Sequence, residues 1–76
     1  MYSSLPRPVL EEHLRQARKH VADGERHLTR QREIVADYER LGLDVAEAEW
    51  LLLQFEELQV MYVADRDRLE KQLASI

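Results

Sequence analysis

The sequence predicts an all-α fold, in which one domain (residues 1–76) forms a long antiparallel helical hairpin of the coiled-coil kind. Proline is absent from Val9 to Ile76 and the chain has only two glycines, a composition that suits long helices and lacks the turn residues of a β-protein. Apolar residues recur at alternating steps of three and four on both sides of one glycine-containing break, Leu41-Gly42-Leu43-Asp44. These observations indicate two helices joined by one turn.

The first helix is predicted over about residues 8–41. Pro8 suits the first turn of a helix, where its missing N–H costs nothing, and Arg7 is disfavoured in a helix because it precedes a proline. One heptad seam runs along this helix, with two weak positions at Gly24 and Gln31. Its members are Leu10, Leu14, Ala17, Val21, Gly24, Leu28, Gln31, Val35 and Tyr38.

The turn is predicted over residues 42–44. Gly42 can adopt the left-handed conformation that ends a helix, and Leu43 can then fold back onto Tyr38. Asp44, followed by Glu47 three residues later, indicates a capping box that opens the second helix. Because so short a connection makes the two helices neighbours, we expect them to pack antiparallel.

The second helix is predicted over about residues 45–74, with a broad apolar stripe that faces the first helix. This stripe contains Val45, Ala48, Leu51, Leu52, Phe55, Leu58, Tyr62, Leu69 and Leu73. The side chains expected to close the hairpin are Leu14, Val21, Leu28, Val35, Leu52, Phe55, Tyr62 and Leu69.

A second series lies on roughly the opposite side of the second helix. It steps by four and three through Ala46, Trp50, Leu53, Glu57, Val60 and Ala64, and Met61 lies beside it. A hairpin covers only one face of a helix, so a helix that is apolar on two sides needs burial from a second direction. We therefore expect a homodimer that assembles as a four-helix bundle. Its expected interface consists of Trp50, Leu53, Glu57, Val60, Met61 and Ala64. Glu57 interrupts the series, either as a carboxylate at the rim or as an acid paired with Arg or His across the interface.

Two other partners are considered. The same face could dock a helix of a different protein, which would make the chain an adaptor. Residues 1–42 carry a net charge of +1 and residues 43–76 a net charge of −5, so weak nucleic-acid association could use the basic residues of the first helix. These are Arg15, Arg18, Lys19, Arg26, Arg30 and Arg32. A helix-turn-helix, an aromatic stacking platform and a basic tail are missing, which argues against that use.

We expect no enzyme activity, no catalytic residues, no metal and no cofactor. The absence of cysteine excludes thiolate chemistry, and two isolated glycines make no phosphate loop. His13, His20 and His27 recur every seven residues, which suggests a metal-binding or pH-sensing column. Helical residues seven apart are separated by ~10.5 Å, so no two of them can share one ion within a chain. Flanking positions beside the seam are the alternative for this column.

No charge-free stretch approaches the roughly 18 residues of a membrane span, and the N-terminal residues lack the pattern of a signal peptide. We therefore expect a cytoplasmic protein that does not contact a membrane.

Three segments carry a resemblance to known sequences: GERHLTRQREIV, LLLQFEE and DRDRLE (residues 24–35, 51–57 and 65–70). With these segments, most of residues 10–73 resembles small uncharacterised helical-hairpin proteins that are abundant in alphaproteobacteria, especially rhizobia. The resemblance implies a stand-alone bacterial protein. It implies no activity and no functional residues.

Overall fold

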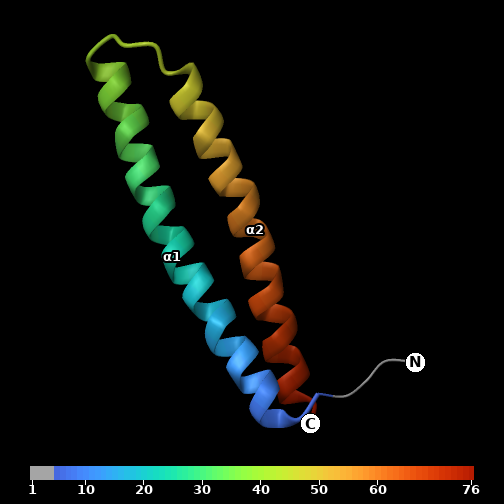
Figure 1. The fold of residues 1–76 in the computed structure, drawn as a ribbon. Helices are drawn as coiled ribbons and strands as arrows, with labels where there is room; N and C mark the ends of the chain where they lie inside the picture. Colours follow the sequence, from blue (N-terminus) through green and yellow to red (C-terminus); the bar gives the residue numbers. More distant parts are fainter. Residues whose placement is uncertain (1–4) are drawn as a thin grey trace.

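The computed structural model describes residues 5–76 as two long helices, α1 (Arg7–Arg40) and α2 (Ala46–Ala74), which run antiparallel and are joined by a short turn (Figure 1). The molecule measures 54 × 22 × 14 Å, and its radius of gyration is 17.1 Å. A compact domain of this length would have a radius of about 11 Å. The predicted all-helical hairpin is confirmed, and its elongated shape leaves most of each helix surface uncovered.

Helix α1 begins one residue earlier than predicted. Arg7 is its first residue, and the carbonyl of the N-cap Pro6 accepts hydrogen bonds from the N–H groups of Val9 (3.0 Å) and Leu10 (3.1 Å). The expectation that Arg7 lies outside the helix is therefore wrong. Pro8 sits at the second helical position, where a missing N–H leaves no intrahelical bond unmade.

The end of α1 follows the prediction closely. Gly42 has a φ of 71°, the left-handed conformation expected for it. The N–H of Leu43 donates to the carbonyl of Tyr38 (2.9 Å), and the N–H of Gly42 donates to the carbonyl of Glu39 (3.2 Å). Together these two bonds form a Schellman motif, which reverses the chain after the last turn of the helix.

The start of α2 differs from the predicted capping box. The N-cap is Val45, which makes no side-chain capping bond. Asp44 lies one residue earlier, and its Oδ1 accepts a hydrogen bond from the N–H of Ala46 (3.0 Å). An aspartate that bonds the N–H two residues ahead forms an Asx turn, which competes with the N-cap geometry. The capping-box prediction is therefore wrong, although Asp44 does prepare the entry to the helix.

The core between the helices is a thin strip in which seven hydrophobic side chains are buried. They are Leu10, Leu14, Ala17, Leu28, Val35, Ala48 and Leu69. Of the eight residues predicted to close the hairpin, four are in this set, and the other four are half-buried: Val21, Leu52, Phe55 and Tyr62. The predicted contact face is thus confirmed for these eight positions.

Part of the predicted stripe on α2 is wrong. Leu51 and Leu58 are 37% and 42% exposed, whereas Gln59 is buried. Steps of four and three from Phe55 lead to Gln59 and Tyr62, so the true seam keeps its spacing and accepts a polar residue. Leu58 is one residue before the seam position Gln59, so it lies on the flank of the hairpin. Tyr38, at the end of the α1 seam, is likewise exposed.

Both weak positions of the α1 seam have a structural use. Gln31 is buried, and its Nε2 donates a hydrogen bond to the carbonyl of Ala48 (2.9 Å). Gly24 faces Gln59, and a Cβ built at Gly24 would lie only 1.7 Å from the Oε1 of that glutamine. Gly24 therefore leaves the space that the Gln59 amide fills.

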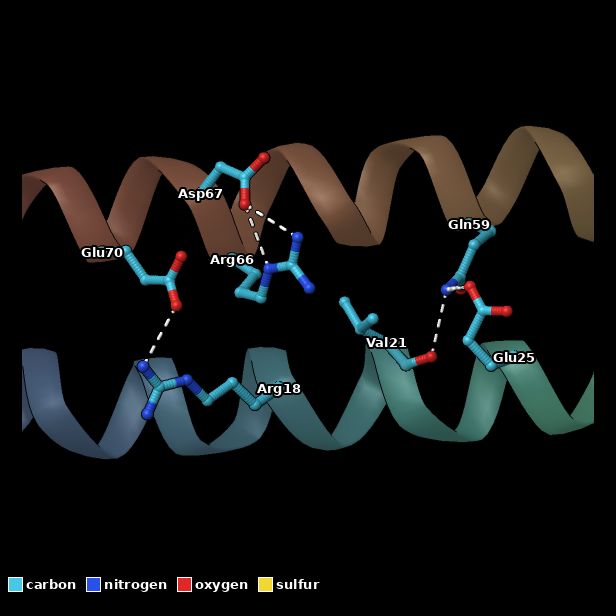
Figure 2. Close-up of polar contacts among 7 residues, drawn as sticks. All are labelled: Arg18, Val21, Glu25, Gln59, Arg66, Asp67 and Glu70. Carbon is cyan, nitrogen blue, oxygen red and sulfur yellow. Dashed lines mark hydrogen bonds and ion pairs between the residues drawn. The ribbon is translucent and has the colours of Figure 1, made fainter.

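Gln59 crosses from α2 to α1 at this point (Figure 2). Its Nε2 donates to the carbonyl of Val21 (3.0 Å) and to the Oε1 of Glu25 (3.1 Å). Its own Oε1 is buried and has no hydrogen-bond partner among residues 5–76. Turning the amide over would place that oxygen against two acceptors, so the observed orientation is the one that the neighbours require.

Candidate functional site

The main exposed feature of the hairpin is the outer face of α2, which consists of Trp50, Leu53, Glu57, Val60, Met61 and Ala64. Its four large apolar side chains are more exposed than covered, at 60% for Trp50, 55% for Leu53, 69% for Val60 and 66% for Met61. Glu57 and Ala64 are exposed as well. At ~100° per residue, these six positions point away from the side of α2 that packs on α1.

The exposed residues of this face are contiguous. Trp50, Leu53, Glu57, Val60 and Ala64 follow one another at steps of three and four, so each lies one turn from the next along the same line. The large apolar members present a patch on the order of several hundred Å², a size that usually has a function on a monomeric surface. The structure thus brings together on one surface all the residues that the sequence assigned to an interface.

One flank of the hairpin is held by ion pairs between the helices. The guanidinium of Arg18 lies 3.0 Å from the carboxylate of Glu70, and that of Arg32 lies 3.9 Å from the carboxylate of Glu56 (Figure 2 shows the first pair). All four side chains are substantially exposed, so each pair stabilises the hairpin only weakly. Both arginines on this flank are thus paired with carboxylates of α2.

The opposite flank carries the histidine column. The ring of His20 lies 5.0 Å from the ring of Tyr62, and the ring of His27 lies 5.8 Å from that of Phe55, measured between centroids. A shallow groove lined by His20, Leu58, Met61 and Tyr62 joins this flank to the outer face of α2. His20 and His27 therefore pack beside the seam as flanking residues. Residues 5–76 contain no group of three or more His, Asp or Glu side chains placed to hold a metal ion.

The six basic residues of α1 that could serve nucleic-acid binding are all paired with carboxylates. Each of the six has an N–O distance to an acid of no more than 3.9 Å: Arg15 to Glu12, Arg18 to Glu70, Lys19 and Arg26 to Asp23, Arg30 to Glu33, and Arg32 to Glu56. Hydrogen bonds from Gln16 and Arg15 lower the pKa of the Glu12 carboxyl, and a hydrogen bond from Lys19 lowers that of Asp23. Each of these positive charges thus has a carboxylate nearby, and Asp23 is shared by Lys19 and Arg26.

The sequence reasoning missed Gln59 and the apolar flank. Both follow from one signal, the strict three-and-four spacing along α2, which continues through polar residues. Gln59 and Arg66 occupy seam positions, and Leu51 and Leu58 consequently move to the flank beside the histidines. Neither change alters the membership of the outer face.

Neither helix, over the residues that the structure describes, has an apolar stretch long enough to cross a bilayer. Comparisons of the chain with models of protein families, with curated proteins and with solved structures each found no match. The resemblance to alphaproteobacterial hairpin proteins therefore stays a prediction, and function is inferred from the chain's own residues and contacts.

Proposed function

We propose that this chain is a non-enzymatic, homo-oligomeric interaction or scaffold module, in which the outer face of α2 binds a second copy of the chain. The observation that carries the proposal is the exposure of Trp50, Leu53, Val60 and Met61 on one face of α2. The proposal includes a homodimer of four helices in a bacterial cytoplasm.

The thin core supports this proposal. Among residues 5–76, seven hydrophobic side chains are buried. Small two-helix scaffolds rarely gain more than a few kcal/mol of net stability from such a core. Burial of a large apolar side chain contributes about 1.5–3 kcal/mol. A partner on the outer face would therefore add a stabilisation comparable to that of the hairpin itself.

The test is size-exclusion chromatography coupled to light scattering on the parent and on a Trp50→Ala, Met61→Ala double variant. The proposal predicts a dimer for the parent and at least tenfold weaker association for the double variant. Ile76→Ala is the matched control, because Ile76 is 65% exposed but lies outside the outer face. A monomeric parent at all concentrations, or a double variant that dimerises like the parent, would contradict the proposal.

An adaptor function uses the same face in a different way. If a helix of another protein occupies it, the chain stays monomeric alone and gains stability only with that partner. The same exposed residues favour this second candidate, and a monomeric parent in the light-scattering experiment would select it.

The ion pairs of α1 argue against a nucleic-acid function. Phosphate binding gains its free energy from cationic side chains that release counterions from the nucleic acid. In this hairpin, a phosphate would have to displace a carboxylate from each of the six basic residues. The exposed charges of α1 are better explained as a solvated helix surface.

A further inference from the structure

We propose that the second copy packs antiparallel on the outer face, α2 against α2, with the two-fold axis beside residue 55. This inference rests on the proposed homotypic function and adds the direction and register of the chains. It follows from the order of residues along the exposed face and from the charges at its rims.

Apart from Met61, the positions of the outer face and Ala46, which precedes it, are spaced symmetrically about residue 55. When the series is reversed, Trp50 lies opposite the partner's Val60, and Leu53 lies opposite the partner's Glu57. Ala46 then lies opposite the partner's Ala64. In this register the largest side chain meets a smaller one, and every layer contains an apolar residue, as close packing requires. A slip of one heptad in one direction would place Trp50 opposite the partner's Asp67. A slip in the other direction would place Val60 opposite the partner's Leu43, which lies in the turn outside α2.

Charge favours the same direction. Between residues 44 and 64 the chain carries five acids and no basic residue. Parallel packing would stack Glu57 on the partner's Glu57 and place Glu47 beside the partner's Glu49, and such like-charge contacts oppose association. Antiparallel packing places Glu47 beside the partner's Met61 and Glu49 beside the partner's Val63. It leaves one like-charge contact, between Glu56 and the partner's Glu56, where the guanidinium of Arg32 lies 3.9 Å from the Glu56 carboxylate of the same chain. It also aligns the two helix dipoles in opposite directions.

The resulting dimer is an open row of four helices, α1–α2–α2–α1, because the outer face lies on the side of α2 remote from α1. A closed four-helix bundle would instead have to bury the histidine flank. Leu51 and Leu58 on that flank are 37% and 42% exposed, less than any of the four large apolar residues of the outer face. The second copy therefore covers the outer face of α2, which has the more exposed apolar side chains of the two surfaces.

Distances between spin labels on the two chains test this arrangement. The chain has no cysteine, so Gln54→Cys and Gln72→Cys, both at exposed polar positions of α2, each give a single labelling site per chain. In the proposed register, label 54 lies beside the two-fold axis and gives a short separation. Positions 72 are offset by 34 residues along the antiparallel helices, which corresponds to about 50 Å.

The possible outcomes separate this inference from the homotypic function on which it rests. A short distance at position 54 with about 50 Å at position 72 supports the inference. Short distances at both positions indicate a parallel dimer, which overturns the antiparallel register and leaves the homotypic function standing. A labelled protein that is monomeric by light scattering overturns both. The Trp50→Ala, Met61→Ala changes should remove both distances, and distances that persist would show that another face is used.

Discussion

At the scale of single residues, the pair Gly24 and Gln59 is the most specific feature of the hairpin. The side-chain amide of Gln59 donates hydrogen bonds to the backbone carbonyl of Val21 and to the carboxylate of Glu25. Gly24 has no side chain, and the amide occupies the space that a Cβ there would fill. A polar residue at a seam position costs some stability but fixes how two helices align. Gly24 and Gln59 therefore set the register between α1 and α2.

This pairing predicts that Gly24→Ala destabilises the parent protein but stabilises a Gln59→Ala variant. In the parent, the new Cβ displaces the buried amide and its hydrogen bonds, a loss that outweighs the gain in helix propensity, so the free energy of unfolding falls by about 1 kcal/mol. In a Gln59→Ala background the space beside Gly24 is free, so Gly24→Ala raises the free energy of unfolding by about 1 kcal/mol. Urea unfolding of the four proteins measures the coupling. Equal effects of Gly24→Ala in both backgrounds would contradict the role assigned to the pair.

Glu57 is the second residue with a specific expectation. It lies in the middle of the outer face, and α2 offers it no basic partner between residues 44 and 64. We expect Glu57→Leu to strengthen dimerisation by about tenfold, since it replaces a partly desolvated carboxylate with apolar area. The same change removes a charge that opposes parallel packing, so the spin-label distances should broaden toward a mixture. Weaker association of Glu57→Leu would instead indicate that the carboxylate pairs across the interface.

At the scale of the elements, the two helices could be predicted from sequence because local signals define them. The absence of proline, the heptad spacing and the Gly42 break place both helices within a residue of their observed ends. The start of α2 was harder to predict, because Asp44 can either cap a helix or form an Asx turn, and the sequence is the same in both cases. The burial of the polar residue Gln59 was not predicted, because its side chain fits only beside Gly24, which lies 35 positions away in the sequence.

The turn makes its own prediction. Gly42 has a positive φ and nothing lies within 4 Å of a Cβ built on it, so a side chain there strains only the backbone. Gly42→Ala should therefore lower the free energy of unfolding by about 1 kcal/mol, and Gly42→Asn by less, because asparagine tolerates the left-handed region. Thermal unfolding followed by circular dichroism checks both variants. An alanine variant as stable as the parent would rule out this strain.

At the scale of the whole molecule, the hairpin has two surfaces of different character. Between the helices, a thin core and two glutamines determine how α1 and α2 align. On the outer face of α2, large apolar residues stay in water unless a partner covers them. Membership of that face was predictable from spacing alone, and its exposure agrees with the prediction. Its occupant depends on a second chain, which the sequence of one chain does not specify.

The dependence of unfolding on protein concentration tests the central claim most directly. If two copies bind through the outer face, a tenfold rise in concentration stabilises the folded dimer by about 1.4 kcal/mol, and the urea midpoint of the parent rises accordingly. The Trp50→Ala, Met61→Ala variant should unfold at a lower midpoint that does not change with concentration. A parent midpoint that stays constant with concentration and matches that of the double variant would contradict the claim that this face binds a second copy.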